Sequence, residues 1–543
     1  MSRIYYNGDI ITMKSKDDNP TAVVTDKDKI IFVGDYDAAK RIYEDADEVD
    51  LEGKTIMPGF IDPHSHFFQT AQSINMCDLS DTESFSDIVD KLDSYKKENA
   101  EIEMIFASGY DHNFLKEYAH PDRKILDTVS DTIPIYISHV SGHMGVANSA
   151  LLKLAGITDD TPDPKGGKFG RYDDGSLSGY VEEIPALMKI LGAAMPLIKI
   201  DMPSQIKKAQ QLYFGYGVTT VQEGAASKDA AIGLAKLAHA GLLDIDVVAY
   251  IMDEEYADCA KQMHEYTLGN YIDHVRIGGS KIILDGSPQG KSAWLSQPYE
   301  NEENYCGYPS HEFAYVEDAC HRAIEGRYQI LAHCNGDAAS EQFVEAYSRA
   351  LENLCGDKSS ADKECADIDI RPVMIHCQTV RDDQLDKMAA IKMIPSIFAG
   401  HIYFWGEVHR NNLGEKRAAR ISPVKSAVER GLVFNLHQDT PVTKPDMLHS
   451  VWCAVNRITK KGRVLGSEQC IDAYEALKGV TINAAYEYKE ENIKGTIEAG
   501  KKADFVVLSD NPLKVKSENI KDIDVIYTIK DGNIVYKRQN ILA

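Results

Sequence analysis

The stretch MPGFIDPHSH, residues 57–66, contains the pattern that decides the fold. An apolar run leads into His64 and His66, and side chains at positions i and i+2 of a β-strand point to the same face. Both imidazoles can therefore reach one metal ion from the end of a strand. Because the chain has 17 histidines, such a pair also arises by chance, and the rest of the sequence must support it.

That support comes from strand-like apolar runs that alternate with helical patterns, which is typical of βαβ units and a parallel sheet. Segments 225–243, 311–327 and 338–354 have helix length and helix-like apolar spacing. Eight strands with intervening helices predict an α/β fold, a (β/α)8 TIM-like barrel. The eight runs end near His66, Gln222, Ile251, Leu284, His333, His376, Phe398 and Asp439.

Further candidate metal ligands stand where barrel enzymes keep their functional groups, at the carboxyl ends of strands. His333 and His376 each end an apolar run, and Asp439 follows the last run. A lone histidine at a strand end is more often a hydrogen-bonded structural residue than a ligand. Four histidines and one aspartate, all at predicted strand ends, favour a metal site.

Both ends of the chain consist of short strand-like runs broken by turn dipeptides, and Asp531-Gly532 is a good hairpin signal. We therefore predict a small β-sandwich built from both termini, residues 1–56 and 491–543, around a barrel in residues 57–490. The stretch between the first two barrel strands is too long for one crossover. It predicts an insertion within residues 67–212, over the mouth of the barrel.

Composition limits the class of protein. The net charge of −25 argues against nucleic acid as a partner, because no excess of Lys and Arg is available to neutralise phosphates. The N-terminus lacks the pattern of a secretion signal, and no apolar run reaches the roughly 18 residues that a membrane span needs. We expect a cytoplasmic enzyme without a membrane partner. The 10 cysteines form no C-x-x-C pair and indicate reduced thiols.

Five motifs make the sequence resemble a known family over nearly its whole length. It resembles the amidohydrolase superfamily (amidohydrolase family 3), in the YtcJ-like branch that includes N-substituted formamide deformylases. The resemblance implies the barrel, a divalent metal and hydrolysis of a carbon–nitrogen bond other than a peptide bond. The motifs are MPGFIDPHSH (57–66), GYDHNF (109–114), SGHMGVANS (141–149), KIILDGSPQGKSAWL (281–295) and GTIEAGKKADFVVL (495–508).

In families of this type, the ligands are the H-x-H pair of the first strand, a residue on the fourth, one His each on the fifth and sixth, and an Asp on the eighth. The resemblance implies that one or two ions, zinc above all, bind His64, His66, His333, His376 and Asp439. On the fourth strand it implies Lys281, which in many relatives is carboxylated to N6-carboxylysine and bridges two metals. An ordinary half-buried lysine is the alternative, and Glu182 is the rival carboxylate.

The predicted function is cleavage of an amide or formamide-like C–N bond in a small molecule by a metal-activated hydroxide. Asp439 would accept the proton of the nucleophile and pass it to the leaving nitrogen. His143 is the expected oxyanion contact and a second catalytic residue. The expected substrate contacts are Tyr110, Asp111, His112, Lys291 and Trp405.

Two other readings stay open. A deaminase or cyclic-amide hydrolase would use the same ligands, commonly with one metal and no carbamate, and a catalytically silent binding protein could keep the fold alone. Many relatives carry a different tetrapeptide with an Arg near Lys291, and many have Gly-Ser where this chain has His437-Gln438. These departures concern substrate identity rather than the ligands. The family also leads us to expect a homodimer.

Overall fold

The computed structural model describes residues 2–99, 101–142, 144–197, 201–355 and 368–539. The chain divides into two compact units, one made of Met1–Phe68 with Ile206–Ala543 and the other of Gln69–Gln205. The predicted oxyanion contact His143 lies outside the described residues. Among the helices that are described, none combines the length and apolar character needed to cross a membrane.

The first unit contains a sheet of eight strands in which every neighbouring pair is parallel, in the order β20-β19-β18-β17-β16-β15-β14-β7. These strands correspond to the eight predicted runs, so the prediction of a TIM-like barrel fold is confirmed. Their bounds are β7 (Phe60–Ile61), β14 (Val218–Ala226), β15 (Asp246–Met252), β16 (Val275–Ile283), β17 (Gln329–Cys334), β18 (Val373–His376), β19 (Ile394–Ile397) and β20 (Asn435–Leu436).

The first and last strands of this sheet meet beyond their carboxyl ends. The Asp439 amide donates to the His64 carbonyl at 3.2 Å, and the His66 amide donates to the Thr440 carbonyl at 2.8 Å. These two bonds connect the segments that follow β20 and β7. They bring the predicted first and last ligand segments together, although the residues are more than 370 positions apart in the chain.

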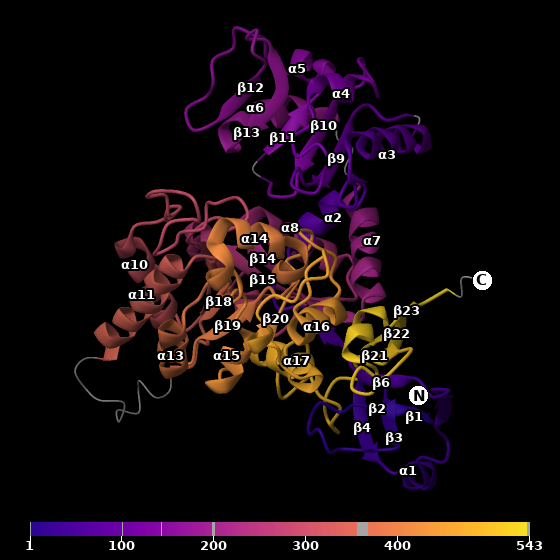
Figure 1. The fold of residues 1–543 in the computed structure, drawn as a ribbon. Helices are drawn as coiled ribbons and strands as arrows, with labels where there is room; N and C mark the ends of the chain where they lie inside the picture. The colour runs from indigo at the N-terminus through magenta and orange to yellow at the C-terminus, as the bar shows by residue number, and fades with distance from the viewer. Residues whose placement is uncertain (1, 100, 143, 198–200, 356–367, 540–543) are drawn as a thin grey trace. The chain divides into compact units, whose positions relative to one another are not determined.

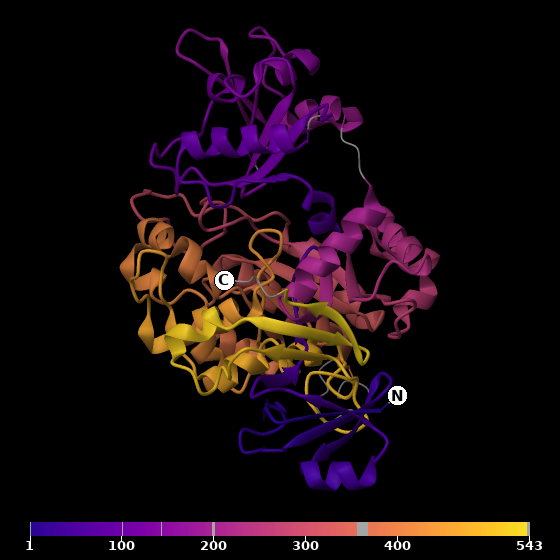
Figure 2. The same cartoon turned by 90° about the vertical axis from the view of Figure 1, so that its right-hand side faces the viewer.

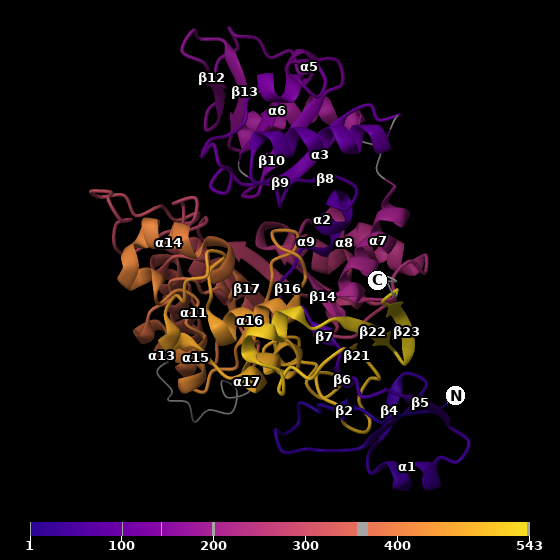
Figure 3. The same ribbon diagram turned by 45° about the vertical axis from the view of Figure 1, so that its right-hand side comes forward.

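Helices surround the strands of the barrel (Figure 3). They pack on the strands that they connect; α8 lies against β15, and α10 and α11 lie against β17. Their bounds are α7 (Met202–Gly215), α8 (Lys228–His239), α9 (Asp253–Gln262), α10 (Phe313–Glu325), α11 (Asp337–Cys355), α13 (Asp382–Ala390), α14 (Gly400–Ala418), α15 (Val424–Glu429), α16 (Met447–Asn456), α17 (Ala473–Lys478) and α18 (Ile482–Glu487), with short 3-10 turns η2 (His264–Thr267) and η3 (Ser467–Gln469).

Strands from both ends of the chain lie together in the first unit, indigo beside yellow in Figures 1 and 2. One sheet has the order β4-β3-β1-β5, and a second has the order β2-β6-β21-β22-β23. Tyr5 and Val23 from the first sheet share a core cluster with Phe505 and Ile529 from the second. The elements are β1 (Ser2–Tyr6), β2 (Asp9–Ile10), β3 (Ala22–Asp26), β4 (Lys29–Gly34), α1 (Tyr36–Ile42), β5 (Asp47–Asp50), β6 (Thr55–Pro58), β21 (Phe505–Leu508), η4 (Ser517–Asp522), β22 (Val525–Lys530) and β23 (Asn533–Lys537).

The second unit is built on a six-stranded mixed sheet of order β12-β13-β11-β10-β9-β8. Two hydrophobic clusters form its core, one around Ile105 and Ile137 and the other around Tyr136 and Val181. Its strands are β8 (Cys77–Asp78), β9 (Ile105–Tyr110), β10 (Ile135–His139), β11 (Met144–Ala147), β12 (Lys168–Arg171) and β13 (Leu177–Glu182); its helices are α3 (Phe85–Glu98), α4 (Arg123–Asp127), α5 (Ser149–Leu154), α6 (Ile184–Ala194) and η1 (Met195–Leu197), and α2 (Phe67–Ser73) follows β7.

Candidate metal centre

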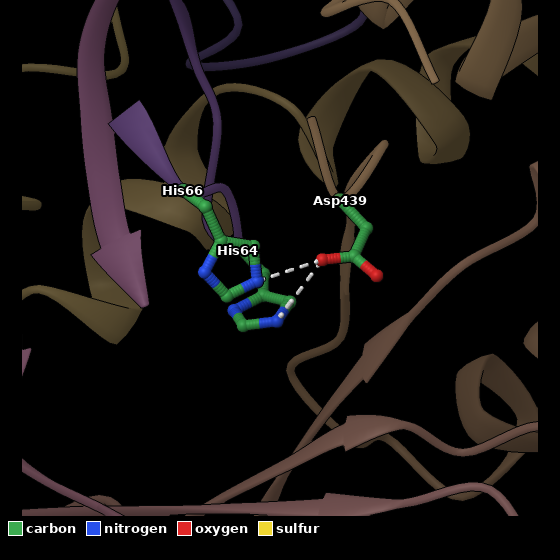
Figure 4. A group of neighbouring side chains, drawn as sticks. All are labelled: His64, His66 and Asp439. Carbon is green, nitrogen blue, oxygen red and sulfur yellow. Dashed lines mark ion pairs between the residues drawn. The ribbon is translucent and has the colours of Figure 1, made fainter. Parts of the chain in front are cut away.

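His64, His66 and Asp439 converge at the carboxyl end of the barrel (Figure 4). Oδ1 of Asp439 lies 3.1 Å from Nε2 of His66 and 3.5 Å from Nε2 of His64. Gly224 on the neighbouring β14 makes room for this arrangement, because a Cβ there would stand 2.6 Å from Cε1 of His64. The three side chains therefore present two ring nitrogens and a carboxylate oxygen to a common point.

His376 on β18 and His333 on β17 extend this group. Nε2 of His376 is 4.0 Å from Oδ2 of Asp439, and the rings of His333 and His376 are 4.5 Å apart. Burial, followed by the neighbouring imidazoles, holds the pKa of His376 well below its usual range, and burial does the same for His64. Both rings are therefore neutral at physiological pH, which is the form that binds a metal.

Asp439 remains ionised beside these rings. Removal from water acts to raise the pKa of Asp439, but the neighbouring His66 and His437 outweigh it, so that the pKa lies below the usual value. Asp439 and His376 both adopt left-handed backbone conformations, with φ of 56° and 77°. Such conformations are uncommon for residues other than glycine and concentrate at functional sites.

Three of these histidines have a hydrogen-bond partner on Nδ1, so that Nε2 is the nitrogen that could bind a metal. His64 Nδ1 is 2.7 Å from Oε1 of Gln222, and His333 Nδ1 is 3.2 Å from Oδ1 of Asp285. His376 Nδ1 is 3.2 Å from Nε2 of His437. The sequence analysis did not identify Gln222, Asp285 or His437 in this role. The signal that could have found them is a polar residue within or just after an apolar strand.

Lys281 lies on β16, where it pairs with Leu331, two residues before His333. Its side chain is buried, and its Nζ forms no hydrogen bond with any described residue. Burial lowers the pKa of Lys281 to about 8, although Asp439 acts in the opposite direction. A buried amine that gives up its proton easily fits carboxylation, because only the neutral amine reacts with carbon dioxide. The residues on this strand therefore fit the implied carbamate.

Glu182, the rival carboxylate, belongs to the other unit. It lies on β13, and its Oε2 is 3.4 Å from the hydroxyl of Tyr180. Lys281, by contrast, lies on the fourth barrel strand itself.

The second unit brings Tyr110, Asp111 and His112 into one network with two histidines that the sequence analysis missed. His139 Nε2 is 3.1 Å from His112 Nδ1 and 3.5 Å from Asp111 Oδ1, and the Tyr110 hydroxyl is 3.0 Å from His120 Nδ1. Burial acts to raise the pKa of Asp111, but its bond to His139 outweighs this and lowers it to about 2.

The oxygen and nitrogen donors of Asp111, His112 and His139 also lie close enough together for a metal. However, the Ser141 amide donates to Nδ1 of His139 at 3.1 Å. Both ring nitrogens of His139 therefore have partners among the described residues. The group is therefore a hydrogen-bonded network in this conformation.

The two remaining predicted substrate contacts lie in the first unit. Lys291 forms an ion pair with Glu302 at 2.7 Å. Trp405 on α14 is buried, and its ring packs 6.2 Å from that of Phe398, which in turn lies 5.3 Å from His437. Trp405 is thus connected to the histidine group through one aromatic ring, whereas the ammonium of Lys291 is held by a loop carboxylate.

The model of the amidohydrolase family matches residues 47–536. The chain belongs to the amidohydrolase family. This amidohydrolase is 24% identical over 98% of both chains to the N-substituted formamide deformylase of Arthrobacter pascens. It is also 24% identical to YtcJ of Bacillus subtilis, over 99% of this chain and 100% of YtcJ. The family resemblance inferred from the motifs is thereby confirmed.

Solved structures agree with the fold of this amidohydrolase. A metal-dependent hydrolase from Pyrococcus horikoshii superimposes with a TM-score of 0.76 at 24% identity, covering 95% of this chain and 99% of that one. An adenosine deaminase from Xanthomonas campestris with bound zinc superimposes with a TM-score of 0.53 at 12% identity, covering 98% of this chain and 92% of that one. Family membership supports a metal-dependent hydrolase that acts on carbon–nitrogen bonds.

Proposed function

We propose that this amidohydrolase cleaves an amide or formamide-like C–N bond of a small molecule at a centre of one or two zinc ions. The observation that carries the proposal is the convergence of four imidazoles and the carboxylate of Asp439 at one end of the barrel. Imidazole nitrogens and carboxylate oxygens are the ligands that zinc prefers. The proposed ligands are His64, His66, His333, His376, Asp439 and carboxylated Lys281.

A divalent metal in such a set lowers the pKa of water toward neutrality and polarises a carbonyl oxygen. Asp439 accepts the proton of the attacking water and later gives it to the leaving nitrogen. Its lowered pKa keeps the carboxylate ionised and ready for the first step. For a formamide, the oxygen of the water forms a new C–O bond to the carbonyl carbon, and the C–N bond then breaks. The products are formate and an amine.

Carboxylated Lys281 would supply anionic oxygen ligands to the metal in this proposal. Its neutral amine attacks carbon dioxide, an N–C bond forms, one proton leaves, and the product is an anionic carbamate. Two properties of Lys281 support this step. Its Nζ is buried and has no hydrogen-bond partner among the described residues, and its pKa is lowered. The choice of a formamide-like substrate is supported by the full-length similarity to the deformylase.

A deaminase is the second candidate, supported by the adenosine deaminase with the same fold. It would need one metal and an unmodified Lys281, and its product would be ammonia instead of formate. A catalytically silent binding protein is the third reading, and it would bind metal weakly or bind substrate analogues without turnover.

Elemental analysis of the purified protein, together with an intact mass that preserves carbamates, tests the proposal. We expect about two zinc ions per chain, a carbon dioxide adduct on Lys281, and release of formate from a panel of N-substituted formamides. Lys281→Met should lose the adduct and at least one metal. Lys501→Met is the control, because the Lys501 ammonium instead donates to the Glu491 carbonyl and Thr496.

The outcomes separate the three readings. One zinc, no adduct and release of ammonia from amino-substituted rings would replace the proposal with the deaminase. No retained metal after reconstitution with zinc and bicarbonate would overturn the hydrolytic mechanism and favour the silent binding protein.

A further inference from the structure

His437 and Ser396 form a chain of hydrogen bonds behind the proposed ligand His376. Nε2 of His437 is 3.2 Å from Nδ1 of His376, and Nδ1 of His437 is 2.9 Å from Oγ of Ser396. All three side chains are buried. Ser396 comes from β19 and His437 follows β20, so two neighbouring barrel strands supply the chain.

The backbone on both sides holds the His437 ring in this position. The His437 amide donates to the Ile397 carbonyl at 3.3 Å, and the hydroxyl of Ser450 donates to the His437 carbonyl at 3.3 Å. The ring also packs 5.1 Å from the ring of His64 and 5.3 Å from that of Phe398. With the ring held in this way, each of its two nitrogens has one hydrogen-bond partner among the described residues.

Neutral rings can arrange the hydrogens of this chain in two ways, because each ring has one N–H and one acceptor nitrogen. In the first, His376 Nδ1–H donates to His437, and His437 Nδ1–H donates to Ser396. In the second, Ser396 donates to His437, and His437 Nε2–H donates to His376. Only the first leaves a lone pair on Nε2 of His376, the nitrogen that faces Asp439.

We propose that Ser396 and His437 are positioning residues that permit the metal-binding tautomer of His376. This role in metal affinity rests on the proposed metal centre. The first arrangement is the one that can bind a metal. The hydroxyl of Ser396 stabilises it by accepting the buried Nδ1–H of His437. Without that hydroxyl, the first arrangement leaves a buried N–H without an acceptor, whereas the second leaves an acceptor nitrogen without a donor, and orphaned buried N–H groups are the rarer of the two in proteins.

The arrangement differs from that of the neighbouring ligand. His333 has a carboxylate on Nδ1, namely Asp285, which also accepts backbone N–H groups from Asn335 and Gly336 at 3.0 and 2.6 Å. A carboxylate can only accept, so it selects the tautomer of His333 by itself. His437 can donate or accept, and it can accept from His376 only when Ser396 accepts its own Nδ1–H.

The test is the dissociation constant of zinc, measured by competition with a chromophoric chelator, in four variants. Ser396→Ala and His437→Phe should each weaken zinc binding about 10- to 100-fold, the usual effect of removing an outer partner of a ligating histidine. Ser396→Thr keeps the hydroxyl and should bind zinc within about threefold of the wild type. Ser450→Ala is the matched control, since it removes a buried hydroxyl that contacts the same histidine only through its backbone.

Nitrogen-15 NMR of the histidine rings supplies a second measurement that a general loss of packing would not reproduce. In metal-free Ser396→Ala, we expect the hydrogen of His376 to shift from Nδ1 toward Nε2. Zinc affinity equal to that of the wild type in both Ser396→Ala and His437→Phe would overturn the inference. A wild type that binds no zinc would instead overturn the proposed function, so that the two failures are distinguishable.

Discussion

At the scale of single residues, the chemistry of the site depends on which ring nitrogen each histidine turns toward Asp439. His64 illustrates this, because Oε1 of Gln222 can only accept the hydrogen of His64 Nδ1. Gln222 is itself held by its amide, which donates to the carbonyl of Pro63 at 2.6 Å and to the hydroxyl of Tyr488 at 3.2 Å. The ligand is therefore oriented by a side chain with no freedom to rotate.

Replacement of Gln222 by leucine should weaken zinc binding about 10- to 100-fold while the fold is retained, because His64 loses the acceptor that selects its tautomer. The dissociation constant of zinc measures this effect. Gln210→Leu is the control, since Gln210 is a buried glutamine that binds the carbonyl of Leu242 and the amide of Asp244. Equal zinc affinities in the two variants would contradict the role given to Gln222.

At the scale of elements, one residue of the motif at 141–149, Asn148, has a structural role. Asn148 is the N-cap of α5, and its Oδ1 accepts the amide of Leu151. The same oxygen accepts the amide of Ile135 on β10, and its Nδ2 donates to the carbonyls of Ser130 and Ile133. This fully buried side chain thus joins a helix start, a strand start and the preceding loop.

Asn148→Ala should destabilise the second unit by about 2 kcal/mol or more, because it removes an N-cap and leaves buried backbone groups without partners. Hydrogen exchange of the β10 amides should accelerate, whereas that of the barrel strands should not. Asn99→Ala tests specificity, since Asn99 is the C-cap residue of α3 and donates from an exposed position. Comparable acceleration of exchange in the two variants would argue against this role for Asn148.

At the scale of the whole molecule, a buried ion network connects the barrel to the strands of the C-terminal segment within the first unit. Asp246 on β15 lies 2.7 Å from Nζ of Lys494 and 3.1 Å from Nζ of Lys530 on β22. Lys530 also pairs with Asp504 at 3.3 Å. These side chains are all buried, so each charge depends on its partners.

Asp246→Asn should destabilise the first unit by about 3–5 kcal/mol, because two buried ammonium groups lose a shared carboxylate. Urea unfolding of the metal-free protein measures the change. Asp273→Asn is a suitable control, since Asp273 pairs with His239 and both side chains are exposed. A loss below about 1 kcal/mol in Asp246→Asn, the range of exposed pairs, would contradict the role of the network.

The same carboxylate predicts how stability depends on pH. Burial acts to raise the pKa of Asp246, but Lys494 and Lys530 outweigh it and hold the pKa well below the usual range. A depressed folded-state pKa means that the stabilisation is fully present above the unfolded value of about 4 and is lost as the pH falls through the folded value. The stability difference between wild type and Asp246→Asn should therefore be constant from pH 8 to 5 and shrink below about pH 4.

Much of the barrel could be predicted from the sequence because parallel strands buried on both faces read as continuous apolar runs. The runs that end at His333 and His376 coincide with the ends of β17 and β18. Since barrel enzymes keep their functional groups at these ends, the same runs also pointed to the candidate ligands. Both steps rest on local periodicity, which a single sequence displays.

The partners of the ligands could not be predicted in this way. Gln222, Asp285 and His437 reach histidines on other strands, between 48 and 158 residues away along the chain. Nothing in the local pattern distinguishes them from other polar residues near strand ends. The left-handed backbone at His376, which redirects its ring at the end of β18, is likewise invisible in the sequence.

The sequence by itself thus determined the family, the order of the barrel strands and the residue types that stand at their carboxyl ends, because periodicity and motifs are local properties of the chain. Only the tertiary structure decided which ring nitrogens of His64, His66 and His376 face Asp439, that the amine of Lys281 is buried, and which residues hold the candidate ligands in place. Those properties depend on contacts between strands that are distant in sequence, and on the loss of water around charged groups, which exists only after the barrel has formed.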